Sequence, residues 1–295
     1  MTDGTVAQSI PRPEVETSAH QLGIPDLVLN CNHAAKFIGL KSPIPYRLRE
    51  DGVNDLKYGM NFAFGGTGVF NTLVSDPNMT TQIDFFQELI KTNAFNASDV
   101  DSSMALVTLS GNDYSAYEVW NGTTQGFPSF ITSVVKQLKV NLKRIHGLGV
   151  KKIAMTALQP LGCLPRSTIK SSFQQCNGTE NSLVSFHNLL LQQAVAKLNN
   201  ETKVSTFVIL NLYDSFIAIS SSSICAGSTK FENPLKPCCG GISSEYYCGS
   251  VDVNGTKKYT VCDDPEAAFF WDSAHPTQEG WSAVYSALQT TLEQL

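Results

Sequence analysis

ALVTLSGND, residues 105–113, is the stretch that most clearly indicates the fold class of this chain. Its first residues are apolar or β-branched and predict a short buried strand, and the Gly-Asn-Asp that follows predicts a turn. A long helix is predicted next, because apolar residues recur every three to four positions: Phe130, Ile131, Val134, Val135, Leu138, Leu142 and Ile145. Gly147 and Gly149 can end that helix.

Two further strands and a second helix are predicted toward the C-terminus. KKIAMTALQPLGC (151–163) reads as a β-rich run bounded by Pro160 and Gly162, and TFVILNLY (206–213) as a third strand. Between them lies a second amphipathic pattern, formed by Leu183, Phe186, Leu189, Leu190, Ala194 and Leu198. Strands that alternate with helices and lack hairpin signals predict an α/β fold with a mostly parallel sheet covered by helices on both faces.

The segment 214–268 differs in kind, because it has little periodicity and contains four consecutive serines from Ser220 and the adjacent Cys238 and Cys239. We expect a loop region tied by disulfides over the rim of the sheet. The chain has eight cysteines, at positions 31, 163, 176, 225, 238, 239, 248 and 262. No CxxC stands with a second CxxC or an HxxxH, so disulfides are favoured over a metal site, with the pairing left open.

Composition and charge exclude some partners. The formal charge of −5 and the pI near 5.5 leave no basic surface for a phosphate backbone, so we expect no nucleic-acid partner. No apolar run reaches the roughly 18 residues that a membrane span needs, and no span is predicted.

The cysteines and six Asn-x-Ser/Thr sequons favour a secreted glycoprotein. The sequons begin at Asn78, Asn96, Asn121, Asn177, Asn200 and Asn254. In contrast, MTDGTVAQSIPRPEVETSAH at the start has no basic region followed by an apolar run, so no signal peptide is expected in this chain. Residues 1–34 are rich in Thr, Pro, Glu and Ser and are expected to be divergent and disordered, with a single domain over 35–295.

FFWDSAHPTQEGW, near the C-terminus, places Asp272 three residues before His275. A hydrolytic histidine needs one ring nitrogen for proton transfer and the other held by an acceptor such as a carboxylate. Asp and His at this spacing on a turn can meet that requirement locally. The alternative is an aspartate that caps a helix beside an unrelated surface histidine.

A second candidate site begins with Gly111-Asn112-Asp113, where the amide of Asn112 can donate a hydrogen bond to an oxyanion. An ordinary turn has the same composition. NFAFGGTG (61–68) adds glycines that allow backbone to approach a ligand closely, but it lacks the spacing of a phosphate-binding loop. The alternative there is a tight turn.

In their order along the chain, these elements resemble the plant GDSL esterase/lipase family of the SGNH hydrolases. NFAFGGTG is similar to the second conserved block of that family, LSGNDYS to the third and WDSAHPTQEGW to the fifth. MTALQPLGCLP and PCCGG also match positions familiar in plant members, and the resemblance runs from about Ala35 to the C-terminus.

This resemblance implies a flavodoxin-like α/β/α sandwich that hydrolyses carboxylic esters by a serine nucleophile, without metal or organic cofactor. It implies His275 as general base and acid, Asp272 as the group that orients it, and Asn112 and the Gly65 N–H as oxyanion-hole donors. Gly66 is the fallback for Gly65. Phe64 stands where members of the family usually have a small Ser- or Thr-like residue.

The first block of the family, a strand followed by Gly-Asp-Ser-Leu, is not found, so no nucleophile is identified and the first strand is expected to be missing. Asp3-Gly4-Thr5, Ser18 and Ser42 are the nearest strings, and none follows an apolar strand. The expected substrate is a small-molecule or polymer ester, such as an acyl lipid or an acetylated glycan. The alternatives are an inactive secreted pseudo-enzyme that binds an ester or glycan, and a truncated isoform.

Overall fold

The structure is a computed structural model that describes residues 42–49, 56–203, 205–221 and 231–295. The chain divides into two compact units. The described part of Met1–Leu158, with Ser185–Asn211 and Leu288–Leu295, forms the first unit. Gln159–Val184 and Leu212–Ala287 form the second. The predicted disordered segment 1–34 lies outside the described residues, and the domain boundaries stay a prediction.

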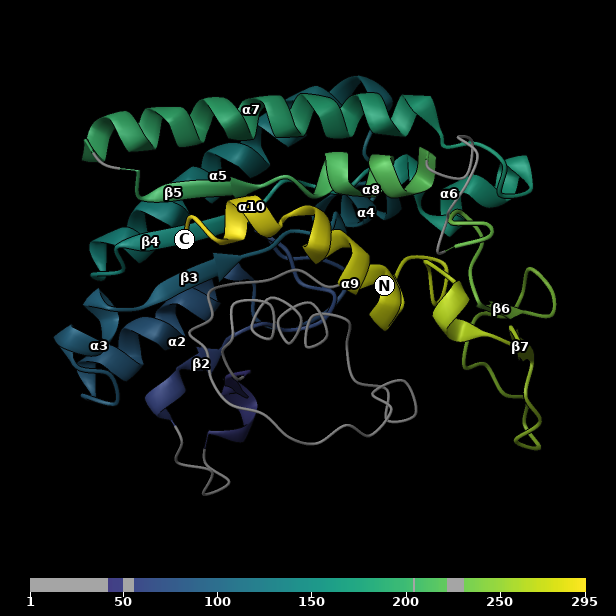
Figure 1. Ribbon diagram of the computed structural model, residues 1–295, viewed down its shortest axis with the longest axis horizontal. Coiled ribbons are helices and arrows are strands. Elements are labelled where there is room, and N and C mark those ends of the chain that lie inside the picture. The colour runs from purple at the N-terminus through teal and green to yellow at the C-terminus, as the bar shows by residue number, and fades with distance from the viewer. Residues whose placement is uncertain (1–41, 50–55, 204, 222–230) are drawn as a thin grey trace. The chain divides into compact units, whose positions relative to one another are not determined.

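The first unit contains a three-stranded parallel sheet in the order β3-β4-β5 (Figure 1). The strands are β3 (Met104–Val107), β4 (Lys152–Thr156) and β5 (Phe207–Leu210). Parallel neighbours need a crossover connection, and helices supply it here. A two-stranded parallel sheet pairs β1 (Ile44–Pro45) with β2 (Met60–Asn61). The predicted α/β class and parallel sheet are confirmed.

Helices cover the three-stranded sheet on both faces. α2 contacts α5 and α5 contacts β4 on one face, while α10 lies over the other (Figure 1). The helices of this unit are α2 (Met79–Lys91), α3 (Ala97–Asp101), α4 (Asn112–Val119), α5 (Phe127–Gly147), α7 (Gly178–Thr202, from Ser185 onward) and α10 (Gln289–Leu292), with short 3-10 turns η2 (Tyr46–Leu48), η3 (Leu56–Tyr58) and η4 (Thr124–Gly126).

Helices are present at both predicted amphipathic patterns, as α5 and α7, but the apolar face predicted for α7 is wrong. Leu189 is 49% exposed, and of the six predicted residues only Leu198 is buried, because the helix turns Val184, His187, Leu191 and Val195 inward instead.

The apolar face of α5 is buried, with Leu142 and Ile145 fully inaccessible to solvent. α5 ends at Gly147, and Gly149 follows with a φ of 112°, a left-handed conformation that glycine adopts without strain. Ile153 and Ala154 of the central strand β4 complete the core beside this helix.

The second unit is built from short elements. They are η5 (Leu161–Cys163), α6 (Pro165–Thr168), η6 (Ile169–Ser171), the first turns of α7 up to Val184, α8 (Leu212–Ser221), β6 (Cys239–Gly241), β7 (Tyr259–Val261), η7 (Pro265–Ala267) and α9 (Gln278–Ala287). β6 and β7 pair in antiparallel fashion. The core is aromatic: the ring of Phe216 on α8 lies 5.3 Å from that of Phe269 and 6.0 Å from that of Trp281 on α9.

Two predicted boundaries are wrong in this region. The third strand ends at Leu210 rather than at residue 213, and the predicted loop region from 214 begins with helix α8. The apolar run TFVILNLY extends past the end of β5 into the first residues of α8, because α8 also has a buried apolar face. Leu212 and Phe216, one helical turn apart on that helix, are both buried. An unbroken apolar run does not distinguish a buried strand from the start of a buried helix.

Three disulfides are present among the described residues, so the prediction of disulfides over a metal site is confirmed for six of the cysteines. They join Cys163 to Cys176, Cys238 to Cys262, and Cys239 to Cys248. Cys31 and Cys225 lie outside the described residues. All three bonds belong to the second unit, whose short elements supply little regular backbone hydrogen bonding.

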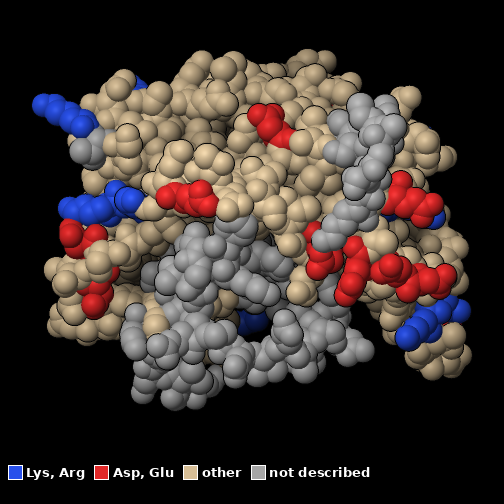
Figure 2. All heavy atoms as spheres, viewed as in Figure 1, with Lys and Arg blue, Asp and Glu red and all other residues tan. Residues whose placement is uncertain are grey.

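Figure 2 shows a described surface that is mostly uncharged on the face drawn, in keeping with a charged fraction of 16%. Within the described parts of the chain, no helix is both long and apolar enough to cross a membrane.

Candidate active site

Asp272 and His275 form a hydrogen-bonded pair within one turn of the second unit. The His275 Nδ1 lies 2.7 Å from the Asp272 Oδ2, and each side chain keeps about a fifth of its surface exposed, 21% for His275 and 22% for Asp272. The other carboxylate oxygen, Oδ1, accepts hydrogen bonds from the amides of Ala274 and His275, both at 2.9 Å. The aspartate therefore closes the turn and holds the ring at the same time.

The environment of Asp272 keeps its carboxylate ionised. Burial alone would raise its pKa, but the hydrogen bond and positive charge of His275, with the amides of Ala274 and His275, bring the pKa below the ordinary value. An ionised carboxylate can only accept a hydrogen bond, so Nδ1 carries the proton. Nε2 is then the ring nitrogen that can take up a proton, as a general base requires.

Asn112 lies at the start of α4 in the first unit and is buried, with 6% of its surface exposed. Its entry into the helix depends on Gly111, whose φ of 99° is left-handed. The Asn112 Nδ2 donates a hydrogen bond to the carbonyl oxygen of Thr67 at 2.9 Å. The structure thus brings Asn112 beside the turn that contains Gly65.

The turn around Gly65 is held by side chains on both sides. The Thr67 hydroxyl donates to the Phe64 carbonyl at 2.8 Å, and the Thr72 hydroxyl donates to the Gly66 carbonyl at 2.6 Å. Gly66 has a φ of 77°, and a Cβ there would lie 2.8 Å from the Val74 side chain. The left-handed backbone and the close Val74 side chain therefore require a glycine at position 66.

The sequence reasoning missed the role of Asp113. Its carboxylate is 3% exposed and accepts hydrogen bonds from the amides of Val69 at 3.0 Å and Phe70 at 2.9 Å. Burial raises the pKa of Asp113, and the backbone hydrogen bonds oppose that rise. A Cβ on Gly68 would lie 2.5 Å from the carboxylate oxygen Oδ2. Asp113 therefore joins α4 to the loop that follows Gly65.

Gln82 is a second residue that the sequence analysis did not select. It is fully buried on α2, and its Nε2 donates to the Thr67 hydroxyl at 3.2 Å and to the Pro77 carbonyl at 2.7 Å. Thr67 thus receives contacts from Gln82 and Asn112 on two different helices. The one sequence feature that could have pointed to Gln82 is its position, as a polar residue, on the apolar face of α2.

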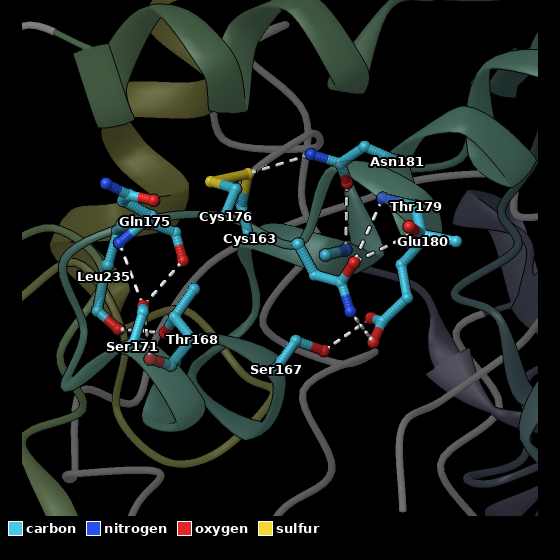
Figure 3. Close-up of a disulfide and its surroundings, with 12 residues drawn as sticks. Cys163, Ser167, Thr168, Ser171, Gln175, Cys176, Thr179, Glu180, Asn181 and Leu235 are labelled. Carbon is cyan, nitrogen blue, oxygen red and sulfur yellow. Dashed lines mark hydrogen bonds between the residues drawn. A yellow bond between two sulfur atoms is a disulfide. The ribbon is translucent and has the colours of Figure 1, made fainter.

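The second unit also contains a hydrogen-bond network beside the Cys163–Cys176 disulfide (Figure 3). The Ser167 hydroxyl donates to the Glu180 Oε2 at 2.5 Å, and the Asn177 Nδ2 donates to the Glu180 Oε1 at 2.7 Å. This network holds α6 in place, and α6 begins at Pro165, the last residue of the MTALQPLGCLP stretch.

Ser42 lies in the first unit, and Ser18 and Asp3-Gly4-Thr5 lie outside the described residues. Within the described ranges, no group of three or more His, Cys, Asp or Glu side chains could hold a metal ion.

A parallel sheet in the first unit and a carboxylate-held imidazole in the second are features found in hydrolytic enzymes that use a histidine for proton transfer. Residues 19–288 match the family described as GDSL-like Lipase/Acylhydrolase, and the chain belongs to this family of ester hydrolases. A GDSL esterase/lipase of Arabidopsis thaliana is 59% identical over 261 residues, which cover 88% of this chain and 73% of that protein. Two further GDSL esterase/lipases of that plant are 49% and 42% identical, each over 88% of this chain and 75% of their own length.

Proposed function

We propose that this chain hydrolyses carboxylic esters with His275 as general base and acid and Asp272 as the residue that orients it. The Asn112 side-chain amide and the Gly65 N–H act as oxyanion donors, with the Gly66 N–H as the alternative to Gly65. The observation that carries the proposal is the 2.7 Å contact between the His275 Nδ1 and the Asp272 Oδ2. Family membership supports it, since the relatives are named esterase/lipases.

The chemistry follows from these roles. The His275 Nε2 takes a proton from a serine hydroxyl as its oxygen attacks the ester carbonyl, and Asp272 stabilises the imidazolium that forms. Asn112 and Gly65 donate hydrogen bonds to the oxygen that becomes negative. The imidazolium returns the proton to the departing alkoxide, and water activated by the same imidazole then releases the acid from the acyl-enzyme.

The nucleophile is not assigned to a residue. No Gly-Asp-Ser string occurs in the sequence, and neither Ser18 nor Ser42 follows an apolar strand. A strand that ends in the nucleophile is what usually presents such a hydroxyl at the edge of an α/β sheet.

A fluorophosphonate probe tests the proposal and locates the nucleophile together. We expect the folded chain to hydrolyse a short p-nitrophenyl ester and to be phosphonylated on one serine, which peptide mass spectrometry identifies. The variant His275→Ala should lose both reactions while keeping its melting temperature. Hydrolysis that is unchanged in His275→Ala would contradict the assigned roles.

The second candidate is an ester- or glycan-binding protein without catalysis, favoured by the missing Gly-Asp-Ser string. It predicts no phosphonylation and no turnover, but saturable binding of a non-hydrolysable ester analogue in calorimetry. Turnover that depends on His275 would rule it out.

We further propose acyl lipids or acetylated glycans as the substrate class, and a secreted location. Three disulfides in the second unit support an oxidising compartment. The sequons at Asn121 and Asn254 lie on exposed turns, where a glycan can be accommodated. Loss of mass after glycosidase treatment of the protein from its natural tissue would support secretion.

A further inference from the structure

We propose that the disulfide-bonded segment 238–262 positions the catalytic pair, so that the Cys238–Cys262 bond is needed for the Asp272–His275 hydrogen bond. This inference rests on the proposed function for its catalytic meaning. Cys238 and Cys262 touch no substrate in this account and act only through the turn that carries the pair. All of these residues belong to the second unit.

The turn that carries the pair is closed at its base by backbone hydrogen bonds. The Trp271 amide donates to the His275 carbonyl at 2.7 Å, and the Thr277 amide donates to the Phe269 carbonyl at 2.8 Å. Phe270 and Pro276 form an antiparallel bridge between these two contacts. Residues 269–277 are thus a narrow hairpin-like ribbon with Asp272 and His275 at its closed end.

The segment around Cys238 pairs with the outer edge of this ribbon. The Cys238 amide donates to the Phe270 carbonyl at 2.9 Å, and the Cys239 amide donates to the Trp271 carbonyl at 2.6 Å. Phe270 therefore pairs on both sides, and Trp271 accepts a bond from Cys239 through the carbonyl that directly precedes Asp272. A displacement of Cys239 would therefore shift the peptide between Trp271 and Asp272 directly.

The disulfides hold the Cys238 segment in that position. Cys238 is bonded to Cys262, whose own amide donates to the Cys238 carbonyl at 2.7 Å. Cys239 is bonded to Cys248 and is 1% exposed. β6 and β7 contribute only three paired residues each, so covalent bonds replace the hydrogen bonds that a longer sheet would supply.

A second support reaches the ribbon from α6. The Arg166 amide donates to the Ser273 carbonyl at 2.9 Å, in the middle of the turn. α6 is held in turn by the Cys163–Cys176 disulfide and the Ser167–Glu180 hydrogen bond (Figure 3). Because this support contacts Ser273 rather than the peptide beside Asp272, we expect it to contribute less to the geometry of the pair.

Geometry at the pair matters because hydrogen bonds weaken steeply with misalignment, and a catalytic group displaced by about 1 Å can lose about a hundredfold in rate. A backbone that carries both Asp272 and His275 in one four-residue turn depends on the peptide that leads into it. The disulfide segment fixes that peptide.

NMR of the oxidised full chain tests the inference without substrate or nucleophile. We expect a strongly downfield proton from the His275 Nδ1–H and a low Asp272 carboxyl pKa in 13C titration. Cys238→Ser with Cys262→Ser should remove the downfield proton and raise that pKa, while circular dichroism stays unchanged. Cys163→Ser with Cys176→Ser is the matched control and should keep both signals. Asp272→Asn should lose the proton with all disulfides intact.

A folded Cys238/Cys262 double variant that keeps both signals would overturn the inference. If that variant fails to fold, hydrogen exchange in the unmodified chain decides. The amides of Cys239 and Trp271 should then open together with equal protection, and independent opening of Trp271 overturns the inference. Failure of the proposed function would be seen in a different measurement: the unmodified chain would show no ester turnover while both NMR signals are present.

Discussion

The Tyr114 hydroxyl lies 2.6 Å from the Nδ1 of His187, and this pair joins α4 to α7 inside the first unit. His187 is 1% exposed, and its Nε2 is buried without a hydrogen-bond partner in the described chain. Burial lowers the pKa of His187 to about 4. The helix that begins with Asn112 is therefore packed against a histidine that stays neutral near neutral pH.

The burial of His187 makes stability depend on pH. The folded pKa of His187 lies below the unfolded value, so only the unfolded chain binds the proton between pH about 6.5 and about 4. Stability should therefore fall as the pH falls through this window, by up to about 3 kcal/mol, and no further below it. Above pH about 6.5 His187 contributes no slope.

Urea unfolding of His187→Gln from pH 4 to pH 7 checks this expectation. The variant should lose this part of the slope, because glutamine does not titrate. Tyr114→Phe is the matched control and should keep it, since burial rather than the tyrosine lowers the pKa. An unchanged slope in His187→Gln would show that other groups cause the acid sensitivity.

Gly68→Ala should destabilise the first unit by about 1 to 3 kcal/mol, because overpacking forces a shift of neighbouring groups. Its Cβ would lie within 2.7 Å of three atoms of the Asp113 carboxyl group. Gly147→Ala is the control, because a Cβ there meets nothing within 4 Å. Thermal melts of both variants give the comparison, and equal melting temperatures would contradict the crowding.

Asp113→Ala should also destabilise the chain, by about 2 to 4 kcal/mol, since it leaves two buried or half-buried amides without acceptors. In the double variant with Gly68→Ala, the two effects should not add, because the carboxylate that crowds position 68 is gone. A double-variant cycle by urea unfolding measures this coupling. Strict additivity would contradict the direct contact.

Asn112→Ala should lower kcat by about 10²- to 10³-fold with little change in KM, because in the proposed function this amide acts on the developing oxyanion rather than on the bound ester. Steady-state hydrolysis of a p-nitrophenyl ester separates the two constants. An effect confined to KM would instead assign Asn112 to ground-state binding.

Local patterns predicted much of this molecule. The strand at Ala105, the helix that became α5 and the Asp272–His275 turn all depend on residues close in sequence, where periodicity or spacing carries the information. The end of the third strand was predicted wrongly, because an apolar run is compatible with both a strand and a helix. The role of Asp113 was not predicted, because its partners Val69 and Phe70 lie 44 and 43 positions away in the sequence.

Local sequence patterns also could not predict the disulfide pairing. Nor could they predict the contacts that Cys238 and Arg166 make with residues 269–277, the ribbon that carries Asp272 and His275. Spacing alone leaves 105 pairings for eight cysteines. The bonds from Cys238 and Cys239 to the ribbon are made by backbone amides, which every residue except proline possesses. No side-chain pattern marks them.

The rate of phosphonylation by a fluorophosphonate tests the central claim most directly, since it reports activation of the nucleophile alone. The account predicts a second-order rate constant that falls by at least about a thousandfold in His275→Ala and by a smaller factor in Asp272→Asn, with both variants folded. Equal labelling rates in the unmodified chain and in His275→Ala would contradict it.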